Sequence, residues 1–222
     1  MMLEVWQHLH RDLTPGVQPD QSTWVVDLGK HQLMLPIRRL PDGDRAVCSL
    51  ILNQASFQVL DALADIVADL LRPHRPEVIV AVPTLGLPLA EAVARRFGHT
   101  RLVPLGYSRK FWYDERLSLP LSSITTPGGG KRIYIDPRML PLLEGRRVAI
   151  VDDVLSSGAS IRAVRDLMSL AGVTPVAVGA AMLQGDRWRG QIDTPILGAF
   201  ETPILQAGPD GWVPIVPKTA MP

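Results

Sequence analysis

Cysteine is nearly absent from this sequence, with Cys48 as its one example among 222 residues. A disulfide within the chain and a cysteine-based zinc site are therefore both excluded. Neither sign of charge dominates either, because 23 Lys and Arg residues stand against 22 Asp and Glu residues. A nearly neutral chain does not hold nucleic acid by bulk charge, so we expect no nucleic-acid partner.

Long hydrophobic runs are missing as well. The longest apolar stretch, residues 173–183, has about half the length that a helix needs to cross a bilayer. The opening residues, MMLEVWQHLHRDL, lack the basic stretch and the uninterrupted apolar run of a secretory signal. We therefore expect a cytoplasmic protein with no membrane contact.

What the sequence does contain is the composition of a folded globular domain, with 46% hydrophobic and 20% charged residues. Strand and helix patterns alternate along it, which predicts an α/β fold with a mainly parallel sheet. Strands are predicted at 24–28, 31–35, 46–52, 78–82, 101–105, 147–151 and 175–182, and helices at 57–72, 86–97, 137–144 and 160–170. Residues 106–137 show no period and are interpreted as a functional loop, and the proline-rich tail from Gly185 is predicted to be irregular.

The stretch VAIVDDVLSSGAS at residues 148–160 carries the most chemistry. An apolar strand ends in Asp152 and Asp153, and a turn rich in hydroxyl groups then opens a helix. In an open α/β sheet, ligands bind beyond the carboxyl ends of the strands. Backbone N–H groups at the following helix start can bind a phosphate, and the carboxylates suit ribose hydroxyls or hydrated magnesium. We expect both carboxylates to face solvent and the turn to be open.

This stretch resembles the phosphoribosyl pyrophosphate signature of type I phosphoribosyltransferases. The resemblance implies that Asp152 and Asp153 act on the ribose and on Mg²⁺, directly or through water. It also implies a 5-phosphate site in the turn that follows. The residues of that site are Ser156, Ser157, Gly158, Ala159 and Ser160.

Three further segments fit the same family. The turn after residues 78–82 resembles its pyrophosphate loop, which often has an unusual peptide geometry, here expected at Thr84 and Leu85. Arg109 and Lys110 resemble the basic pair that offsets the charge of the leaving diphosphate, as catalytic residues. The pyrophosphate-loop residues are Pro83, Thr84, Leu85 and Gly86, and the mobile-loop residues are Ser122, Ser123, Thr125 and Thr126.

The resemblance also implies a domain plan. Residues 1–222 would form a single phosphoribosyltransferase domain with its core at 53–184 and a mobile catalytic loop at 107–137. Residues 1–52 and 185–222 would form a hood that contacts the acceptor base. Aromatic residues in such a cover, among them Trp188, serve more often for packing than for stacking on a base. Relatives commonly form dimers, so a homodimer is expected.

The implied activity is transfer of the 5-phosphoribosyl group from phosphoribosyl pyrophosphate to a nucleobase, with a purine favoured. Hypoxanthine-guanine members carry an acid where this chain has Ser156, and adenine members usually have one where Pro83 stands. Neither subtype is therefore assigned. An alternative is a non-catalytic regulator that keeps the fold to sense nucleotides. An α/β hydrolase is disfavoured because no GxSxG motif occurs.

Overall fold

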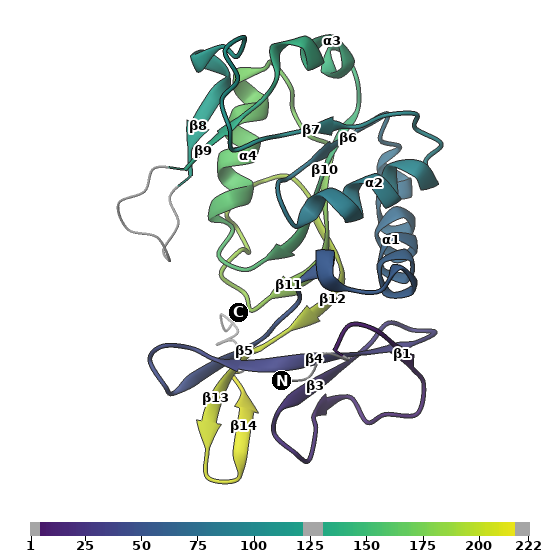
Figure 1. The fold of residues 1–222 in the computed structure, drawn as a ribbon, viewed down its shortest axis with the longest axis vertical. Coiled ribbons are helices and arrows are strands. Elements are labelled where there is room, and N and C mark those ends of the chain that lie inside the picture. Colours follow the sequence, from purple (N-terminus) through teal and green to yellow (C-terminus); the bar gives the residue numbers. More distant parts are fainter. Residues whose placement is uncertain (1–4, 122–130, 216–222) are drawn as a thin grey trace, which may run out of the picture.

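The computed structural model describes residues 5–121 and 131–215, which build a parallel sheet with helices on both faces and an antiparallel sheet beside it (Figure 1). The parallel sheet has the strand order β12-β11-β10-β6-β7. Its strands are β6 (Val78–Ala81), β7 (Val103–Pro104), β10 (Val148–Leu155), β11 (Ala177–Gln184) and β12 (Ile196–Thr202). The helices are α1 (Phe57–Leu71), α2 (Gly86–Arg96), α3 (Leu140–Leu143) and α4 (Ala159–Leu170). The predicted α/β class with a parallel sheet is confirmed.

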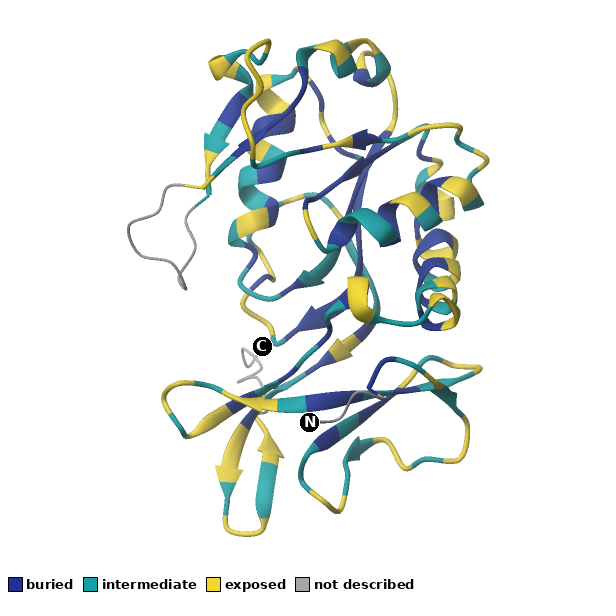
Figure 2. Ribbon diagram, viewed as in Figure 1, coloured by how far each residue is buried: buried dark blue, intermediate teal, exposed yellow. Residues whose placement is uncertain are grey.

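The side chains of the buried strands point alternately to the two faces of this sheet, which explains why helices cover both faces. Successive side chains of a strand point to opposite faces. Ile79 and Ala149 pack toward α1 and α2, whereas their neighbours Val80 and Val148 pack toward α4. Figure 2 shows the central strands buried along their length, with the sheet-facing side of α1 buried and its outer side exposed. These two apolar layers fix the direction of β10, on which the candidate site depends.

The antiparallel sheet forms the hood beside the carboxyl edge of the parallel sheet (Figure 1). Its strands are β1 (Leu9–His10), β2 (Gly16–Val17), β3 (Thr23–Asp27), β4 (Gln32–Arg39), β5 (Arg45–Cys48), β13 (Ile204–Gly208) and β14 (Gly211–Pro214). The predicted hairpin near the N-terminus is confirmed as β3 and β4. One buried hydrogen bond ties the sheets together, because Gln184 Nε2 at the end of β11 donates to the Cys48 carbonyl at 2.7 Å.

The prediction of an irregular tail from Gly185 is wrong. β12 pairs with β11 inside the parallel sheet, so this part of the predicted hood segment belongs to the core sheet, while β13 and β14 extend the hood. Proline is tolerated at strand ends because it lacks only the N–H. Pro195 precedes β12, Pro203 separates β12 from β13, and Pro214 ends β14. The division of the rest of the chain into one core, one hood and one mobile loop stays a prediction.

Residues 106–137 are also more regular than the sequence predicts. They contain a short antiparallel pair, β8 (Ser118–Pro120) and β9 (Arg132–Tyr134). Arg132 donates to the Ser118 hydroxyl at 2.7 Å and to the Ser118 carbonyl at 3.2 Å, and Ile133 is buried. Strands of three residues are too short to show a period in the sequence. The segment that joins β8 to β9 lies largely outside the described residues.

Candidate functional site

The two acidic residues lie inside β10, which continues to Leu155 rather than ending at Val151 as the sequence predicts. Asp152 still pairs in register with Ala180 of β11. On the other side of β10, β6 has already ended at Ala81, and Val82 N donates a last hydrogen bond to the Val151 carbonyl at 3.0 Å. The acids therefore occupy the point where one neighbouring strand has left the sheet.

The prediction that both carboxylates face solvent is wrong for Asp152, which is only 7% exposed, whereas Asp153 is partly exposed. The cause is the start of α2, which packs directly on the strand. An added Cβ at Gly86 would lie 2.8 Å from Asp152 Oδ1 and 2.9 Å from its Cα. Glycine is needed here for close approach. Asp152 Oδ1 also accepts a hydrogen bond from Asp153 N at 2.8 Å.

Burial and proximity shift the protonation of this pair. Loss of hydration, followed by the neighbouring Asp153 charge, raises the pKa of Asp152 well above its usual range. Burial raises the pKa of Asp153 too. Two carboxylates this close do not both ionise easily, so the pair holds a proton until a cation or a hydrogen-bonding ligand compensates the charge. The site is thus prepared for a positive or hydroxyl-rich group.

The predicted pyrophosphate loop lies against these acids. Its Pro83 and Gly86 are buried, while Thr84 is exposed at the turn. The loop does have an unusual peptide geometry, but the cis peptide bond joins Pro83 to Thr84, one residue earlier than the Thr84–Leu85 position that the sequence predicts. No described side chain caps the start of α2 at Leu85. Because the first N–H groups of a helix have no partner within it, they can bind an anion.

The predicted 5-phosphate turn has the same kind of helix start. Gly158 adopts the left-handed conformation, with φ at 78°, and no described side chain satisfies the helix start from this N-cap position. Ser157 Oγ accepts a longer hydrogen bond from Ala159 N at 3.3 Å. The turn is only partly open, since Gly158 is buried beneath Trp188 and Gln191. Ser156 and Ser157 stay partly exposed and Ser160 is exposed, so its rim remains accessible.

The basic pair is less closely tied to the acids. Arg109 and Lys110 are exposed, and Arg109 forms an ion pair with Glu115 at 3.0 Å. Surface pairs of this kind contribute little to stability, so the guanidinium can exchange Glu115 for another anion. Their role with diphosphate stays a prediction. Ser122, Ser123, Thr125 and Thr126 lie outside the described residues.

Residues 50–195 match the family model described as "Phosphoribosyl transferase domain". The chain belongs to this family. The matched range contains the acids, the turn at 156–160 and the loop at 83–86, so the resemblance carried by those residues is confirmed at the family level.

Several proteins are similar to this chain. An orotate phosphoribosyltransferase of Halorhodospira halophila is 36% identical over 127 residues, covering 54% of this chain and 51% of that protein. An adenine phosphoribosyltransferase of Saccharopolyspora erythraea is 34% identical and covers 67% of this chain and 77% of that protein. The transcriptional regulator GfcR of Halobacterium salinarum is 31% identical, and the match covers 88% of this chain and 87% of that protein. The chain thus spans about half the length of the orotate relative.

The fold is that of this family. The solved adenine phosphoribosyltransferase of Saccharomyces cerevisiae superposes with a TM-score of 0.58 at 18% identity, over 74% of this chain and 93% of that one. At this identity the likeness concerns the fold alone. In the described part of the chain, no helix is long and apolar enough to span a membrane.

The carboxylates of the site suit a metal ion that takes most of its ligands from the substrate and from water. Within residues 5–121 and 131–215, no three His, Cys, Asp or Glu side chains are arranged to bind one ion. Mg²⁺ commonly uses one or two carboxylates and fills its other positions with water and phosphate oxygens. Asp152 and Asp153 can supply that small share. They fit a magnesium ion that arrives with a diphosphate.

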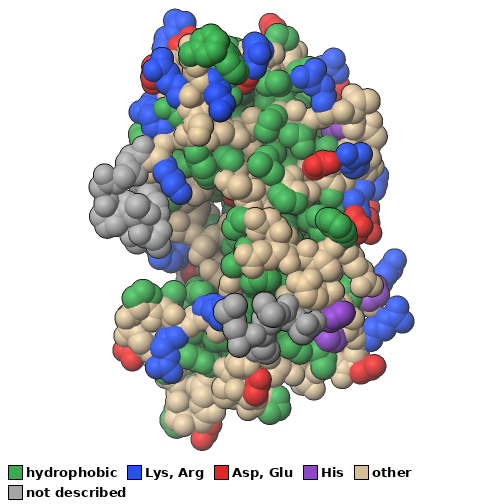
Figure 3. Space-filling model, in the orientation of Figure 1, with side chains coloured by type: hydrophobic (Ala, Val, Ile, Leu, Met, Phe, Trp, Pro, Cys, Tyr) green, Lys and Arg blue, Asp and Glu red, His purple; other side chains and the backbone are tan. Residues whose placement is uncertain are grey.

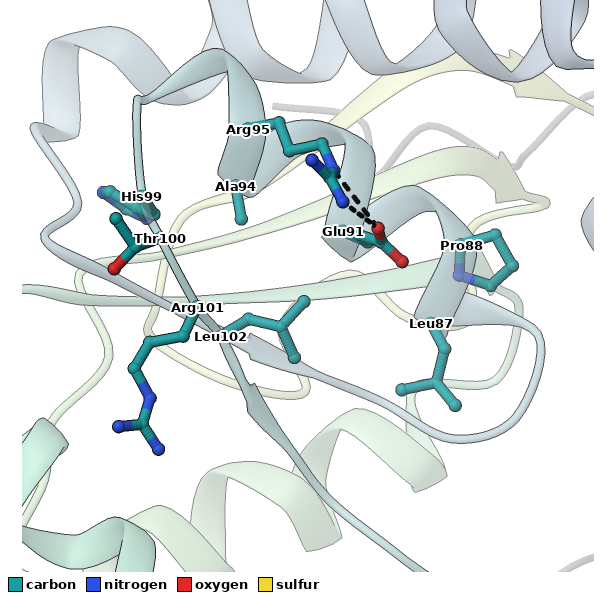
Figure 4. Close-up of a pocket in the computed structure, with 9 residues that line it drawn as sticks. All are labelled: Leu87, Pro88, Glu91, Ala94, Arg95, His99, Thr100, Arg101 and Leu102. Carbon is teal, nitrogen blue, oxygen red and sulfur yellow. Dashed lines mark hydrogen bonds and ion pairs between the residues drawn. The ribbon is translucent and has the colours of Figure 1, made fainter.

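The pockets found in the described residues lie apart from the acids, and two of them border the parallel sheet or its helices. One, of about 620 Å³, is bordered by the outer face of α2, where Glu91 pairs with Arg95, and by residues 99–102 (Figure 4). The other, of about 290 Å³, lies at the carboxyl ends of β11 and β12 and is lined in part by Asp186, Arg189 and Thr202. Thr202 is 3% exposed, and its hydroxyl has no partner among the described residues. On the face shown in Figure 3, the surface is hollowed between the hood and the α/β part.

Two residues near the site differ from the expectation. Trp188, placed in the hood by the sequence, is buried in the core with its Nε1 donating to the Gly185 carbonyl at 2.9 Å, so its role is packing. Tyr107 was missed altogether, although its hydroxyl donates to the Pro83 carbonyl at 2.6 Å. Its position two residues before Arg109, after a strand of the same sheet, is the signal that could have indicated it.

Proposed function

We propose that this protein transfers the 5-phosphoribosyl group of phosphoribosyl pyrophosphate to a nucleobase and releases pyrophosphate. The observation that carries the proposal is the position of Asp152 and Asp153 between two helix starts whose N-cap residues, Leu85 and Gly158, carry no capping side chain. A donor with phosphate at both ends and hydroxyl groups in the middle matches that order of anion sites and carboxylates. Membership of the phosphoribosyl transferase family supports the same reaction.

In the proposed reaction, a ring nitrogen of the base forms a bond to the anomeric carbon while the bond from that carbon to the diphosphate oxygen breaks. The electron pair leaves with pyrophosphate, and the ring N–H proton passes to solvent. Asp152 and Asp153 hold the ribose hydroxyls and stabilise the positive charge that grows on the sugar. The turn at 156–160 anchors the 5-phosphate, and the start of α2 holds the diphosphate. Bound magnesium would neutralise diphosphate charge.

Arg109 and Lys110 complete the proposed site as cations for the leaving group. Arg109 would exchange Glu115 for a diphosphate oxygen, which offers more negative charge and a bidentate contact. We propose a purine as the acceptor, in keeping with the adenine relative and with the hydrophobic character of the hood. The pocket at Asp186, Arg189 and Thr202 is our candidate for its binding, because its buried hydroxyl has no described partner. A homodimer is part of the proposal, and light scattering in solution tests it.

A second candidate function is sensing without catalysis. It is favoured by the similarity to the GfcR regulator, which extends over 88% of this chain, more than the similarity to the adenine relative. Described residues 5–52 form mostly strands and short turns, so that part of the chain contains no helix-turn-helix. A regulator of this kind would bind the donor sugar and change its affinity for a partner instead of turning it over.

A nucleobase screen separates the two functions. The protein is incubated with Mg²⁺, phosphoribosyl pyrophosphate and one base from a panel of adenine, guanine, hypoxanthine, xanthine, orotate and uracil, and pyrophosphate release is measured. We expect release that depends on a purine. Calorimetric binding of the donor with no release for any base would support the sensor instead. A protein that neither binds nor consumes the donor would refute both.

A further inference from the structure

Tyr107 joins three parts of the site that are far apart in the sequence. Its hydroxyl donates to the carbonyl of Pro83, the first residue of the pyrophosphate loop, at 2.6 Å. The ammonium of Lys131 lies over its ring, 5.5 Å from the ring centre. Asp152 and Asp153 lie close enough to raise the pKa of the same phenol, after burial as the larger cause. One side chain therefore contacts the loop and a cation and lies within the field of the acids.

The backbone holds Tyr107 firmly in this position. Its neighbour Gly106 exchanges two hydrogen bonds with Tyr134 of β9, at 3.0 and 2.8 Å. Its ring packs against the apolar layer that covers the α4 side of the sheet. Lys131 is also fixed at its backbone, because its carbonyl accepts from Leu121 N at 2.8 Å. The contacts of Tyr107 are thus between anchored segments rather than between freely moving side chains.

The hydrogen bond reaches the diphosphate site through a rigid unit. A peptide group is planar, so holding the Pro83 oxygen also fixes the direction of the Thr84 N–H. Thr84 is exposed at the turn of the loop, so a ligand can reach this residue. The phenol remains a donor at neutral pH, because burial first and the two aspartates next raise the pKa of Tyr107.

We propose that Tyr107 is a positioning residue for diphosphate: its hydroxyl orients the loop at Pro83 and its ring holds the Lys131 ammonium beside it. The proposal rests on the donor site proposed above. It adds a cation, Lys131, to the pair formed by Arg109 and Lys110. It also separates the diphosphate end of the site, which depends on Tyr107, from the 5-phosphate end at 156–160, which does not.

Isothermal titration with two probes tests this separation. Pyrophosphate with Mg²⁺ reports on the loop, and ribose 5-phosphate reports on the turn at 156–160. Tyr107→Phe removes the hydroxyl and keeps the ring under Lys131. We expect about 2- to 12-fold weaker pyrophosphate binding, the range that one net hydrogen bond supplies, and unchanged ribose 5-phosphate binding. Ser56→Ala at the start of α1, outside the proposed site, is the control and should bind both probes like the wild type.

The role of the Tyr107 ring in holding Lys131 is tested by combining variants at the two positions. Tyr107→Leu should weaken pyrophosphate binding more than Tyr107→Phe does, because it removes the support for the ammonium as well. Lys131→Gln should weaken binding in the wild-type and Tyr107→Phe backgrounds by the same factor and have a smaller effect beside Tyr107→Leu. Such non-additivity is the signature of residues that act as a pair.

The outcomes are distinguishable. Tyr107→Phe with wild-type affinity for pyrophosphate, or with equal losses for both probes, would overturn the positioning role while leaving the proposed function intact. If Tyr107→Leu does not fold, the Tyr107→Phe result decides by itself. A wild-type protein that binds neither probe nor phosphoribosyl pyrophosphate would instead refute the proposed function.

Discussion

The helices α1, α2 and α4 begin in two different ways. At α1, the Ser56 hydroxyl accepts a hydrogen bond from Val59 N at 3.3 Å, and Ser56 N donates to the Trp6 carbonyl at 3.0 Å. At α2 and α4, which follow β6 and β10, the N-cap residues Leu85 and Gly158 carry no capping side chain, and at α4 Ser157 Oγ accepts from the first helix N–H, that of Ala159. A helix start that only supports the fold is satisfied from within the chain, whereas one that binds a ligand leaves its N–H groups available.

We expect the largest effect from changes to Asp152 and Asp153, because these residues lie between the starts of α2 and α4. The double variant Asp152→Asn with Asp153→Asn keeps the shape of the site but removes its negative charge. We expect base-dependent pyrophosphate release to fall by at least ~100-fold, since loss of one electrostatic stabiliser of a transition state already costs that much. Asp69→Asn on the exposed side of α1 is the control and should retain full activity. Unimpaired turnover in the double variant would remove the acids from the reaction.

Gly158→Ala tests the start of α4 itself. A Cβ at this position would lie 3.0 Å from Gln191 Cγ and 3.2 Å from Trp188 Cα, in a backbone with φ at 78°. Gly172, just after the end of the same helix, has φ at 72° and open space around it. Both alanine variants should lose about 1–2 kcal/mol of unfolding free energy from the left-handed backbone. Calorimetry should show at least ~10-fold weaker ribose 5-phosphate binding for Gly158→Ala alone, because only its Cβ meets neighbours. Equal binding by the two variants would contradict a phosphate role for this turn.

The pH dependence of stability sharpens the contrast between the acids and ordinary surface carboxylates. Burial raises the pKa of Asp152 and Asp153 in the folded state, so the folded protein binds more protons than the unfolded chain at mildly acidic pH. Stability from this pair is present at low pH and is lost as pH rises through the raised pKa values. Each unit of upward shift corresponds to about 1.4 kcal/mol.

The measurement compares the wild type with the double Asn variant in the absence of Mg²⁺ and donor. Urea unfolding at pH 5 and pH 7.5 should show the wild type losing stability relative to the variant as pH rises. Asp136 has the opposite sign, because its hydrogen bonds to Arg138 lower its pKa to about 2, and it is unchanged in both proteins. A difference between the two proteins that does not vary with pH would mean that the acids are hydrated like surface groups.

Ser56→Ala has the smallest expected effect on function. Loss of the side-chain cap of α1 should lower the unfolding free energy by about 1 kcal/mol. Pyrophosphate release should be unchanged, because this helix start holds no proposed ligand. Ser157→Ala is the matched change beside α4, where Ser157 Oγ accepts from Ala159 N. There we expect weaker ribose 5-phosphate binding, so the two serine variants should separate stability from binding.

The sequence predicts those features of the fold and the site that neighbouring residues determine. The apolar strand before Asp152, the helix after Gly158 and the loop at Pro83 are encoded by neighbouring residues and were found in place. The burial of Asp152 was not predictable, because it depends on the approach of Gly86 from another part of the chain. The bond from Tyr107 to Pro83 spans 24 residues and leaves no periodic trace. β12 was missed because flanking prolines look like loop residues until their places at strand ends are known.

The passage from β12 to β13 has a consequence for the choice of acceptor. A single residue, Pro203, separates a strand of the parallel sheet from a strand of the hood, and the Gln184 bond to Cys48 closes the same junction from β11. The hood and the parallel sheet cannot separate at this junction without breaking the buried hydrogen bond from Gln184 to Cys48. We therefore expect an acceptor base bound between the hood and the parallel sheet to be selected by its size as well as by its polar contacts.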